Sequence, residues 1–493
     1  MKRLAIIGGG WAGLACAQVV AQTNAQSQEP VAIWLFEASP FMGGRARGIP
    51  WETELGQTAV DNGQHLLLGA YEQTWQLLKE AGVFLERGWS NEPMHWASLE
   101  PESGNRYALL RIPPQAWPWR FFGQTFPAFI DKKHARPWGL LDRLSLTNVL
   151  RQAIQSKWHA RGSAFGWLSD VSMPAGVRHQ FWRPLVEGAL NTSWTEASAS
   201  VFLRVVKDSL TGPSGATNCW HPHADLSQNA VDPLCLSLKR QGVRLIPRCR
   251  IAALGQEGPS ATSASRRWRL EPHASSQDQA AAVGLEHEVF DAVVLATPAY
   301  EARRLWRQSG LTETPAIKRM DQMDWRGVMT LYIHLSRAQA LQLGPIRQWL
   351  CSLPGLNDQR HIGLARQPSE NGSQVVSIVA SGLDPQQDRS AVADSLWQAA
   401  QHYLRPLGLE TLRTLPHRFT DDPRATWACT ERFIDSEPSA MHDPVSACLT
   451  GLDGVLRAAD DLTAGYPACI EAAVRSGRAC GSSLVAQAPR KAV

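Results

Sequence analysis

The sequence lacks the cysteine patterns of disulfide-rich and zinc-binding proteins. Its nine cysteines are scattered, their number is odd, and no C-x-x-C pair occurs among them. A disulfide scaffold or a structural zinc site would need paired or closely spaced cysteines. We therefore expect a cytoplasmic protein, from a reducing compartment, that holds no metal.

Long apolar runs and a strong net charge are also missing. No apolar stretch reaches the roughly 18 residues that a membrane-spanning helix needs. The formal net charge of +4 is too small to indicate a nucleic-acid partner. With 493 residues, of which 44% are hydrophobic and 19% charged, the chain can bury a sizeable core in about two to four domains.

Tyrosine is scarce, with 6 copies, whereas tryptophan is abundant, with 20. Tryptophan in this number suits the lining of a pocket for an apolar substrate, or a position at a membrane surface. Scatter through the core and over the surface explains it equally well, so composition alone does not decide between these alternatives.

A glycine motif follows the first apolar run. Residues 2–7 have the pattern of a buried strand, and residues 14–20 have that of an apolar helix. Between them, Gly8, Gly10 and Gly13 form a G-x-G-x-x-G motif. Gly8 allows the tight turn, Gly10 lets the backbone approach a pyrophosphate, and Gly13 lets the helix pack closely on the strand. The N-terminus of the helix supplies free N–H groups for phosphates, so the motif predicts a dinucleotide site.

The basic start and the apolar stretch that follows would also fit a secretory signal peptide. Glu37 favours the dinucleotide site over that alternative. A second buried-strand pattern at 31–36 ends in Glu37, 24 residues after Gly13. An acidic residue that binds the ribose is expected about 20 residues after the last glycine. The polar loop at 23–30 accounts for the extra length. Because a carboxylate repels a 2′-phosphate, Glu37 disfavours NADP.

A second glycine pair, Gly43 and Gly44, precedes Arg45. A close backbone approach beside an arginine suits another phosphate contact. This double signature resembles the flavin-containing amine oxidase and phytoene desaturase superfamily, whose members bind FAD. The resemblance implies an α/β fold, in which an FAD-binding Rossmann-like domain of the GR2 type is interleaved with an α+β substrate-binding domain.

We predict that three stretches of the chain, 1–75, 230–320 and 430–493, assemble the FAD-binding domain. The substrate-binding domain then comprises 76–229 and 321–429. Apolar patterns predict helices at 232–240 and 468–477, and strands at 242–246, 249–254, 290–298, 328–335 and 375–380. The polar stretch 255–285 is predicted to be a variable loop, and 488–493 a frayed tail.

The C-terminal segment resembles the superfamily motif that ends in A-G-D, with Ala459 in place of the glycine and Asp460 as the aspartate. The resemblance implies that Asp460 lies near the ribityl-phosphate arm of FAD, and that Ala468 and Ile470 face the flavin ring. A helix N-terminus at this point would stabilise an anionic reduced flavin. The alternative is an amphipathic terminal helix with a solvent-exposed aspartate. Ala459 leaves open how closely the backbone approaches the cofactor.

Two further stretches narrow the resemblance. Residues 61–71 begin with D-N-G-Q-H, and residues 181–192 contain P-L-x-x-x-A-L-N-T. Both resemble the hydroxysqualene dehydroxylases, the squalene-associated FAD-dependent desaturases of bacterial hopanoid pathways. The resemblance implies that hydroxysqualene loses its hydroxyl group and that hydride from N5 of reduced FAD reaches the resulting allylic cation, which gives squalene. It also assigns further residues to the cofactor site, namely Gly44, Arg45, Gly63, Gln64 and Val243.

His65 is the candidate catalytic residue, as proton donor to the leaving hydroxyl, because it adjoins the loop expected at the flavin. The alternative is that Gln64 and His65 only form hydrogen bonds to the flavin or the backbone. Asn191 and Thr192 either border the substrate site or cap a turn.

The expected partners are a long apolar isoprenoid substrate and an external electron donor or flavin reductase, because no second dinucleotide motif is evident. Residues 113–122, with Lys132 and Lys133 nearby, either dock peripherally on the inner face of the cell membrane or pack in the interior. Two rival functions stay open. One is an oxidative carotenoid or phytoene desaturase or an amine oxidase of the same superfamily, and the other is a lipid escort without redox chemistry, like the Rab GDP-dissociation inhibitors.

Overall fold

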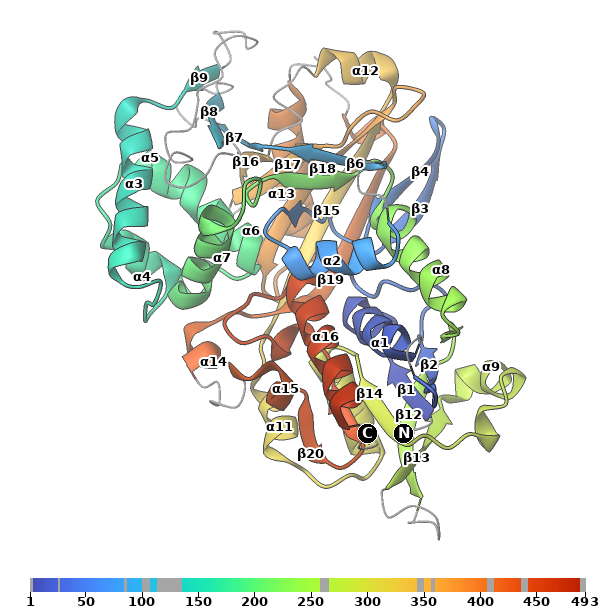
Figure 1. The fold of residues 1–493 in the computed structure, drawn as a ribbon. Coiled ribbons are helices and arrows are strands. Elements are labelled where there is room, and N and C mark those ends of the chain that lie inside the picture. Colours follow the sequence, from blue (N-terminus) through green and yellow to red (C-terminus); the bar gives the residue numbers. More distant parts are fainter. Residues whose placement is uncertain are drawn as a thin grey trace.

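The fold is seen in a computed structural model of the chain (Figure 1), which describes residues 3–24, 27–83, 87–99, 107–112, 135–257, 266–343, 350–355, 360–405, 412–435 and 442–487. The stretch expected to dock on a membrane, 113–122 with Lys132 and Lys133, lies outside these ranges, as does the tail at 488–493. Within these ranges, no helix is both long and apolar enough to cross a membrane.

A six-stranded sheet carries the start of the chain, with its strands in the order β11-β2-β1-β14-β21-β20. Its strands are β1 (Arg3–Ile7), β2 (Ala32–Phe36), β11 (Arg244–Ile246), β14 (Ala292–Leu295), β20 (Leu449–Leu452) and β21 (Val455–Arg457). Neighbouring strands are parallel except at the edge, where β20 is antiparallel to β21. Parallel strands are buried on both faces, which is why the sequence shows them as continuous apolar runs.

Two helices of this half pack unusually closely, α1 (Trp11–Asn24) and α16 (Ile470–Gln487), which lie side by side in Figure 1. A Cβ atom on Gly477 would lie 2.2 Å from the carbonyl oxygen of Ala12, and one on Gly481 would lie 2.8 Å from Cβ of Val19. Only glycine allows this approach, so the helix predicted at 468–477 is present and packs against the helix of the first glycine motif.

The second sheet has eight strands in the order β19-β15-β18-β17-β16-β7-β8-β9. They are β7 (Met94–Leu99), β8 (Tyr107–Ile112), β9 (Ala135–Pro137), β15 (Trp325–Leu335), β16 (Leu350–Pro354), β17 (Arg360–Ala365), β18 (Gln374–Leu383) and β19 (His417–Trp427). Helix α13 (Arg389–Leu404) packs on one face, where Leu331, Ile378 and Leu396 share a core. The strands predicted at 328–335 and 375–380 are therefore confirmed, and their other face is free to line a cavity.

Most remaining helices gather beside the second sheet or connect the two sheets. Those beside it in Figure 1 are α3 (Leu140–Gln155), α4 (Ala164–Ser169), α5 (Ala175–Val177), α6 (Arg183–Leu190) and α7 (Ala199–Thr211). The others are α2 (Glu72–Glu80), α8 (Asp232–Arg240), α9 (Gln277–Ala282), α10 (Ala299–Gln308), α11 (Pro315–Lys318), α12 (Arg337–Gln342), α14 (Glu431–Asp435) and α15 (Pro444–Ala447). Helix α8 confirms the prediction at 232–240.

Three smaller sheets complete the strands, in the orders β5-β10-β6, β12-β13 and β3-β4. Their strands are β3 (Gly48–Thr53), β4 (Gly56–Asp61), β5 (Leu67–Leu68), β6 (Trp89–Glu92), β10 (Cys219–Pro222), β12 (Ile251–Glu257) and β13 (Arg267–Pro272). Two π-helical turns, η2 (Arg178–Trp182) and η3 (Ser227–Val231), lead into α6 and α8.

The prediction of a loop over 255–285 is wrong for most of that stretch. Strand β12 continues to Glu257, β13 pairs with it in an antiparallel hairpin, and α9 follows. The physical signal is the alternation in β13, where Trp268 and Leu270 are buried while Arg269 and Glu271 are exposed. Charged residues on the outer face lower the mean hydropathy of the segment and hide that alternation.

We predict that Gly477→Ala lowers the free energy of unfolding by about 1–3 kcal/mol, because its methyl group would overlap the Ala12 carbonyl and force α1 and α16 apart. Urea unfolding followed by tryptophan fluorescence measures this loss. Gly166→Ala is the matched control in α4, since its Cβ would meet only Ser163 Oγ, at 3.5 Å. An equal effect of the two substitutions would contradict the close helix contact.

Candidate active site

A cavity of about 750 Å³ is lined by residues of both large sheets. At one end it is bounded by the two glycine motifs, Glu37 and the segment 459–470. At the other end its walls are mainly hydrocarbon and aromatic side chains from the eight-stranded sheet and from α3 and α6, while α7 adds both apolar side chains and the polar Arg204, Asp208 and Ser209. The cavity therefore joins a polar, glycine-lined end to an apolar end.

The three glycines of the first motif have different surroundings. A Cβ atom on Gly8, whose φ is +116°, would lie 2.3 Å from the Ala296 carbonyl oxygen, and one on Gly13 would lie 2.1 Å from the Gly8 carbonyl oxygen. At Gly10 the nearest atom would be Cα of Gly44, at 3.8 Å, which is ordinary contact. The fold itself therefore excludes side chains at Gly8 and Gly13, whereas a side chain at Gly10 would only enter the cavity. That cradle fits a diphosphate held by backbone N–H groups.

Glu37 lies at the end of β2 and faces the same cavity. Its two carboxylate oxygens accept hydrogen bonds from the N–H groups of Gly9 and Ser39, each at 2.8 Å. Each carboxylate oxygen has a second lone pair, so the group can still accept hydrogen bonds from ribose hydroxyls. The backbone contacts fix its position, as the predicted ribose-binding role requires.

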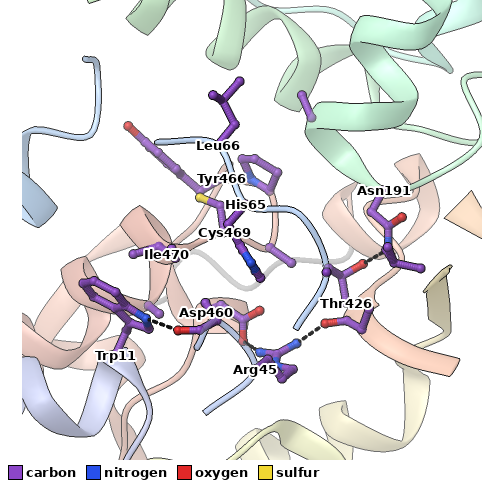
Figure 2. A pocket seen from close by; sticks show the side chains of 18 of the residues that line it. Trp11, Arg45, His65, Leu66, Asn191, Thr426, Asp460, Tyr466, Cys469 and Ile470 are labelled. Atoms are coloured by element: carbon purple, nitrogen blue, oxygen red, sulfur yellow. Dashed lines mark hydrogen bonds and ion pairs between the residues drawn. The ribbon is translucent and has the colours of Figure 1, made fainter. Parts of the chain in front are cut away.

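Arg45 and Asp460 form an ion pair at the glycine-lined end, with Nη2 2.8 Å from Oδ1 (Figure 2). Nη1 of Arg45 donates a second hydrogen bond to the carbonyl oxygen of Ala425, at 2.5 Å. Burial acts to lower the pKa of Arg45, but the charge of Asp460 and its hydrogen bond outweigh this and raise it. A permanently charged arginine is thus fixed beside the cradle, where it can neutralise phosphate charge.

The segment that leads into α16 brings its N-terminus to the cavity. Ala468, Cys469 and Ile470 all line the cavity. Ala459 has a φ of −158°, an extended conformation open to any residue, so alanine replaces the glycine of the family motif without backbone strain. The N-terminus of this 18-residue helix presents unpaired N–H groups and a positive dipole end to the cavity.

His65 lines the cavity, and Figure 2 shows its ring directed into the space beside Arg45 and Asp460. Burial lowers its pKa, and the charges of Arg45 and Arg366 lower it further, whereas Asp61 and the Gly63 carbonyl act to raise it. These protein groups favour the neutral imidazole, which can give or accept a hydrogen bond. Among the described residues, the ring Nδ1 is buried without a hydrogen-bond partner.

Asn191 combines the two roles that the sequence left open. It caps α6 in the left-handed conformation, with a φ of 44°, and also lines the cavity. Its Nδ2 donates to Thr426 Oγ1 at 2.8 Å (Figure 2), and its Oδ1 accepts from the Gly382 N–H at 2.6 Å. Thr192 does not line the cavity, because its hydroxyl bonds to the Leu190 carbonyl and the Cys429 N–H.

The floor of the apolar end is one face of the eight-stranded sheet. Side chains at every second position of a strand share a face. Those facing the cavity include Met94 and Trp96 of β7, Leu110 and Ile112 of β8, and Ile362 and Leu364 of β17. The register places Trp96 opposite Leu110 and Met94 opposite Ile112, so these residues form one continuous apolar surface.

Helix α6 forms a wall along the length of the cavity. Leu185, Gly188 and Asn191 line it at helical spacing, with Trp182 just before the first turn. From Trp182 to Asn191 the helix rises roughly 13 Å at 1.5 Å per residue. Asn191 bonds to Thr426, next to the carbonyl that holds Arg45, so this end of α6 is the cofactor end. Trp182 and its edge-on neighbour Phe181 therefore mark the far, aromatic end.

Two of the predicted cofactor residues do not line the cavity. Gly13 packs against the Gly8 carbonyl, and Val243, which the resemblance assigned to the cofactor, lies away from the cavity. Val243 is buried in the core beside α8, where its N–H donates to the Leu238 carbonyl at 3.0 Å. The residues that line the cavity in this region are Cys249, Arg250 and Ile251, at the start of β12. The reason is topological, because Val243 precedes the edge strand β11, whereas the chain turns into the cavity only after it.

Sequence reasoning gave no role to Tyr466, which lines the cavity. Its hydroxyl donates a short hydrogen bond to Asp208. Both carboxylate oxygens of Asp208 also accept from Nε of Arg204, each at 3.0 Å. Burial, and then the bond to Asp208, raise the pKa of Tyr466. The guanidinium carbons of Arg204 and Arg475 lie 4.8 and 4.9 Å from its ring centre. Tyr466 and Asp208 are 258 positions apart, so no local pattern reveals the contact.

Comparisons with known proteins agree with this arrangement. The family model "Flavin containing amine oxidoreductase" matches residues 11–481. A hydroxysqualene dehydroxylase of Sinorhizobium fredii (strain NBRC 101917 / NGR234) is 24% identical over 488 residues, which cover 97% of this chain and 96% of that protein.

Two solved amine oxidases are similar over whole chains. The cyclohexylamine oxidase from Brevibacterium oxydans IH-35A has a TM-score of 0.64 at 14% identity, with 99% of each chain covered. Wild-type putrescine oxidase bound to putrescine has a TM-score of 0.61 at 12% identity, again with 99% of each chain covered. These likenesses concern the fold, and they confirm the predicted α/β class with a Rossmann-like FAD-binding part and a substrate-binding part.

We predict that Gly10→Ala folds normally but binds FAD at least about tenfold more weakly, a loss of about 1.4 kcal/mol, because the methyl group occupies the diphosphate cradle. Flavin absorbance of the purified protein and FAD titration of the stripped protein measure this. Gly8→Ala is the contrasting variant and should fail to fold, since its Cβ would overlap the Ala296 carbonyl. Full flavin content in Gly10→Ala would show that the cradle does not hold the diphosphate.

Proposed function

Because the chain belongs to the flavin-containing amine oxidoreductase family, we propose that this FAD-dependent oxidoreductase removes the hydroxyl group of hydroxysqualene reductively and releases squalene. The observation that carries the proposal is the cavity, which runs from the glycine cradle into a long apolar compartment. The similarity to a hydroxysqualene dehydroxylase over 97% of the chain supports this substrate.

Several residues of the glycine-lined end would hold FAD. Glu37 would bind the adenosine ribose, Gly10 and Gly44 would let the backbone approach the diphosphate, and Arg45 with Asp460 would border the ribityl-phosphate arm. The start of α16 would stabilise negative charge on the reduced ring. Reducing equivalents would come from an external donor or a flavin reductase. Peripheral membrane contact stays a prediction about residues outside the described ranges.

The chemistry requires the C–O bond of the substrate to break and a new C–H bond to form at the same carbon. The hydroxyl leaves as water with one added proton, and bound reduced FAD supplies a hydride, so it ends oxidised while the substrate is reduced. The protein must bind a long hydrocarbon, exclude water and protonate the leaving oxygen. The apolar floor and the α6 wall meet the first two requirements.

Two polar residues at the cofactor end are candidates to meet the leaving oxygen. His65 has a buried nitrogen without a partner in the described part of the chain, and Asn191 lies on the same end of the cavity. The aromatic residues Phe181 and Trp182 lie roughly 13 Å away along α6, beyond the distance of about 6 Å over which a cation interacts with an aromatic ring. We therefore assign them to the binding of the hydrocarbon chain. We assign the proton-donor role to His65, which must act as the imidazolium, the form that burial opposes and the charge of Asp61 favours.

An amine substrate fits the cavity less well. A cationic amine would need an unpaired carboxylate or polar atoms in the substrate compartment. Of the acidic side chains that line the described part of the cavity, Glu37 and Asp422 accept hydrogen bonds from backbone N–H groups, and the other three are held in ion pairs. Asp208 pairs with Arg204, Glu301 with Arg250 and Arg304, and Asp460 with Arg45. An oxidative desaturase would share the apolar compartment, so the direction of electron flow must be measured.

We predict that purified protein, reduced with dithionite under anaerobic conditions, converts hydroxysqualene into squalene with one flavin oxidised per product. Mass spectrometry of the lipid and flavin absorbance at the oxidised maximum measure the two quantities. Stripped protein without FAD is the control. If the reduced protein forms no squalene while the oxidised protein desaturates a polyene, the oxidative alternative is correct. A colourless protein that binds the lipid without turnover would favour the escort alternative.

We predict that Gly188→Leu lowers squalene formation at least about tenfold while FAD stays bound, because the new side chain extends into the cavity from the middle of α6. No atom lies within 4 Å of a Cβ at this position, so the helix itself tolerates the change. The matched control is Gly176→Leu, which is equally uncrowded but does not line the cavity. Unchanged turnover in Gly188→Leu would place the substrate elsewhere.

A further inference from the structure

A buried ion pair lies behind the loop that carries Gln64 and His65. Nη2 of Arg366, the residue after β17, lies 3.0 Å from Oδ2 of Asp61, the last residue of β4. The Arg366 side chain is 6% exposed and that of Asp61 is fully buried. A charge pair at this depth needs further hydrogen bonds to offset its desolvation, and the structure supplies them.

Every nitrogen of the Arg366 guanidinium has an acceptor. Nη1 donates to the carbonyl oxygens of Ala59 and Ala224, at 3.0 and 3.1 Å, and Nε donates to Gln64 Oε1 at 3.2 Å. Asp61 is held from its other side, because its Oδ1 accepts from the Leu226 N–H at 3.0 Å. Arg366 therefore joins the eight-stranded sheet to four residues on the segments around the loop.

The contact to Gln64 continues to His65. The side-chain oxygen of Gln64 accepts from Arg366, and Nε2 of the same amide donates to the His65 carbonyl oxygen at 3.1 Å. A planar guanidinium with fixed donors can orient such a loop, whereas a lysine cannot make the same set of contacts. The position of the His65 ring in the cavity thus depends on a residue that does not itself line it.

The same pair sets the electrostatic surroundings of His65. The charged groups that act on its ring are Asp61 on β4, Arg366 beyond β17 and Arg45 of the second glycine motif. Asp61 favours the imidazolium, while the two arginines oppose it. Because Asp61 and Arg366 are paired, their opposite effects on His65 partly cancel, and the balance changes when either partner is lost.

We propose that Arg366, through its ion pair with Asp61 and its hydrogen bond to Gln64, is a positioning residue that fixes the loop and with it the orientation of His65 in the cavity. Neither the sequence motifs nor the comparisons assign Arg366 a role. The inference concerns the loop at the cofactor end and holds whichever substrate the apolar end takes.

The test is an NMR titration of the oxidised holoprotein labelled with [13Cε1]histidine. Its 14 histidines give separate signals, and the signal lost in His65→Asn identifies His65. Arg366→Gln removes a positive charge and should raise the pKa of His65, whereas Asp61→Asn removes a negative charge and should lower it. Arg366→Lys keeps the charge, so it should leave the pKa near that of the wild type while the resonance itself moves, because the loop is no longer held.

The control is Arg413→Gln, the same charge change in the exposed pair with Asp394, which should shift nothing. If either single variant fails to fold, Asp61→Asn/Arg366→Gln, which buries no unpaired charge, takes its place. The double variant should displace the His65 resonance from its wild-type position. Unchanged or like-signed pKa shifts in the single variants, or a wild-type resonance in the double variant, would overturn the proposal. The titration uses no substrate, so it is independent of the hydroxysqualene assay.

Discussion

The arrangement of the active site depends on close backbone contacts around helix α1, and only glycine, which has no side chain, allows these contacts. Gly13 meets the Gly8 carbonyl at the start of α1, and Gly477 meets the Ala12 carbonyl from α16. These contacts bring two helices from opposite ends of the chain side by side (Figure 1), so that both N-termini are directed at one cavity. Under the proposed function, the positive ends of two helix dipoles would act on one bound dinucleotide, one at its diphosphate and the other at its redox ring. A Cβ at either contact would move a dipole end away from the cofactor.

Charges buried near the cavity pose a different problem, because they are costly unless each has a partner. The protein resolves this by pairing across distant segments. Arg45 holds Asp460 and Arg366 holds Asp61, and each arginine also donates to backbone carbonyls. Breaking one such pair would cost about 3–5 kcal/mol, since the remaining charge would be buried alone. The pairs and these backbone contacts therefore tie the second glycine motif and β4 to the eight-stranded sheet.

The cofactor end could be predicted from the sequence because its determinants are local. Gly8, Gly10, Glu37 and Arg45 act through turns and strand ends that a short window of sequence reveals, and the parallel strands appear as continuous apolar runs. Arg366 could not be found in this way, because its partner Asp61 lies 305 positions earlier. The contact exists only once β4 and β17 are brought together by the fold. The position of Val243 away from the cavity could not be foreseen for a related reason, since a motif does not show on which side of an edge strand the cavity opens.

In helix α6 the sequence motif and the geometry of the cavity can be compared directly. Its sequence motif pointed to a substrate class by resemblance, but its geometry gives that motif a physical meaning. One end carries Asn191 at the cofactor, the middle carries Gly188, where a side chain would fill the cavity, and the far end begins at Trp182. Polarity therefore falls along roughly 13 Å of one helix, from hydrogen-bonding groups to aromatic rings. A ligand that matches this gradient would place its polar group and the carbon that bears it at the cofactor end, and its hydrocarbon chain along α6. An allylic alcohol within a long isoprenoid has that distribution of polarity, whereas a short, charged amine does not.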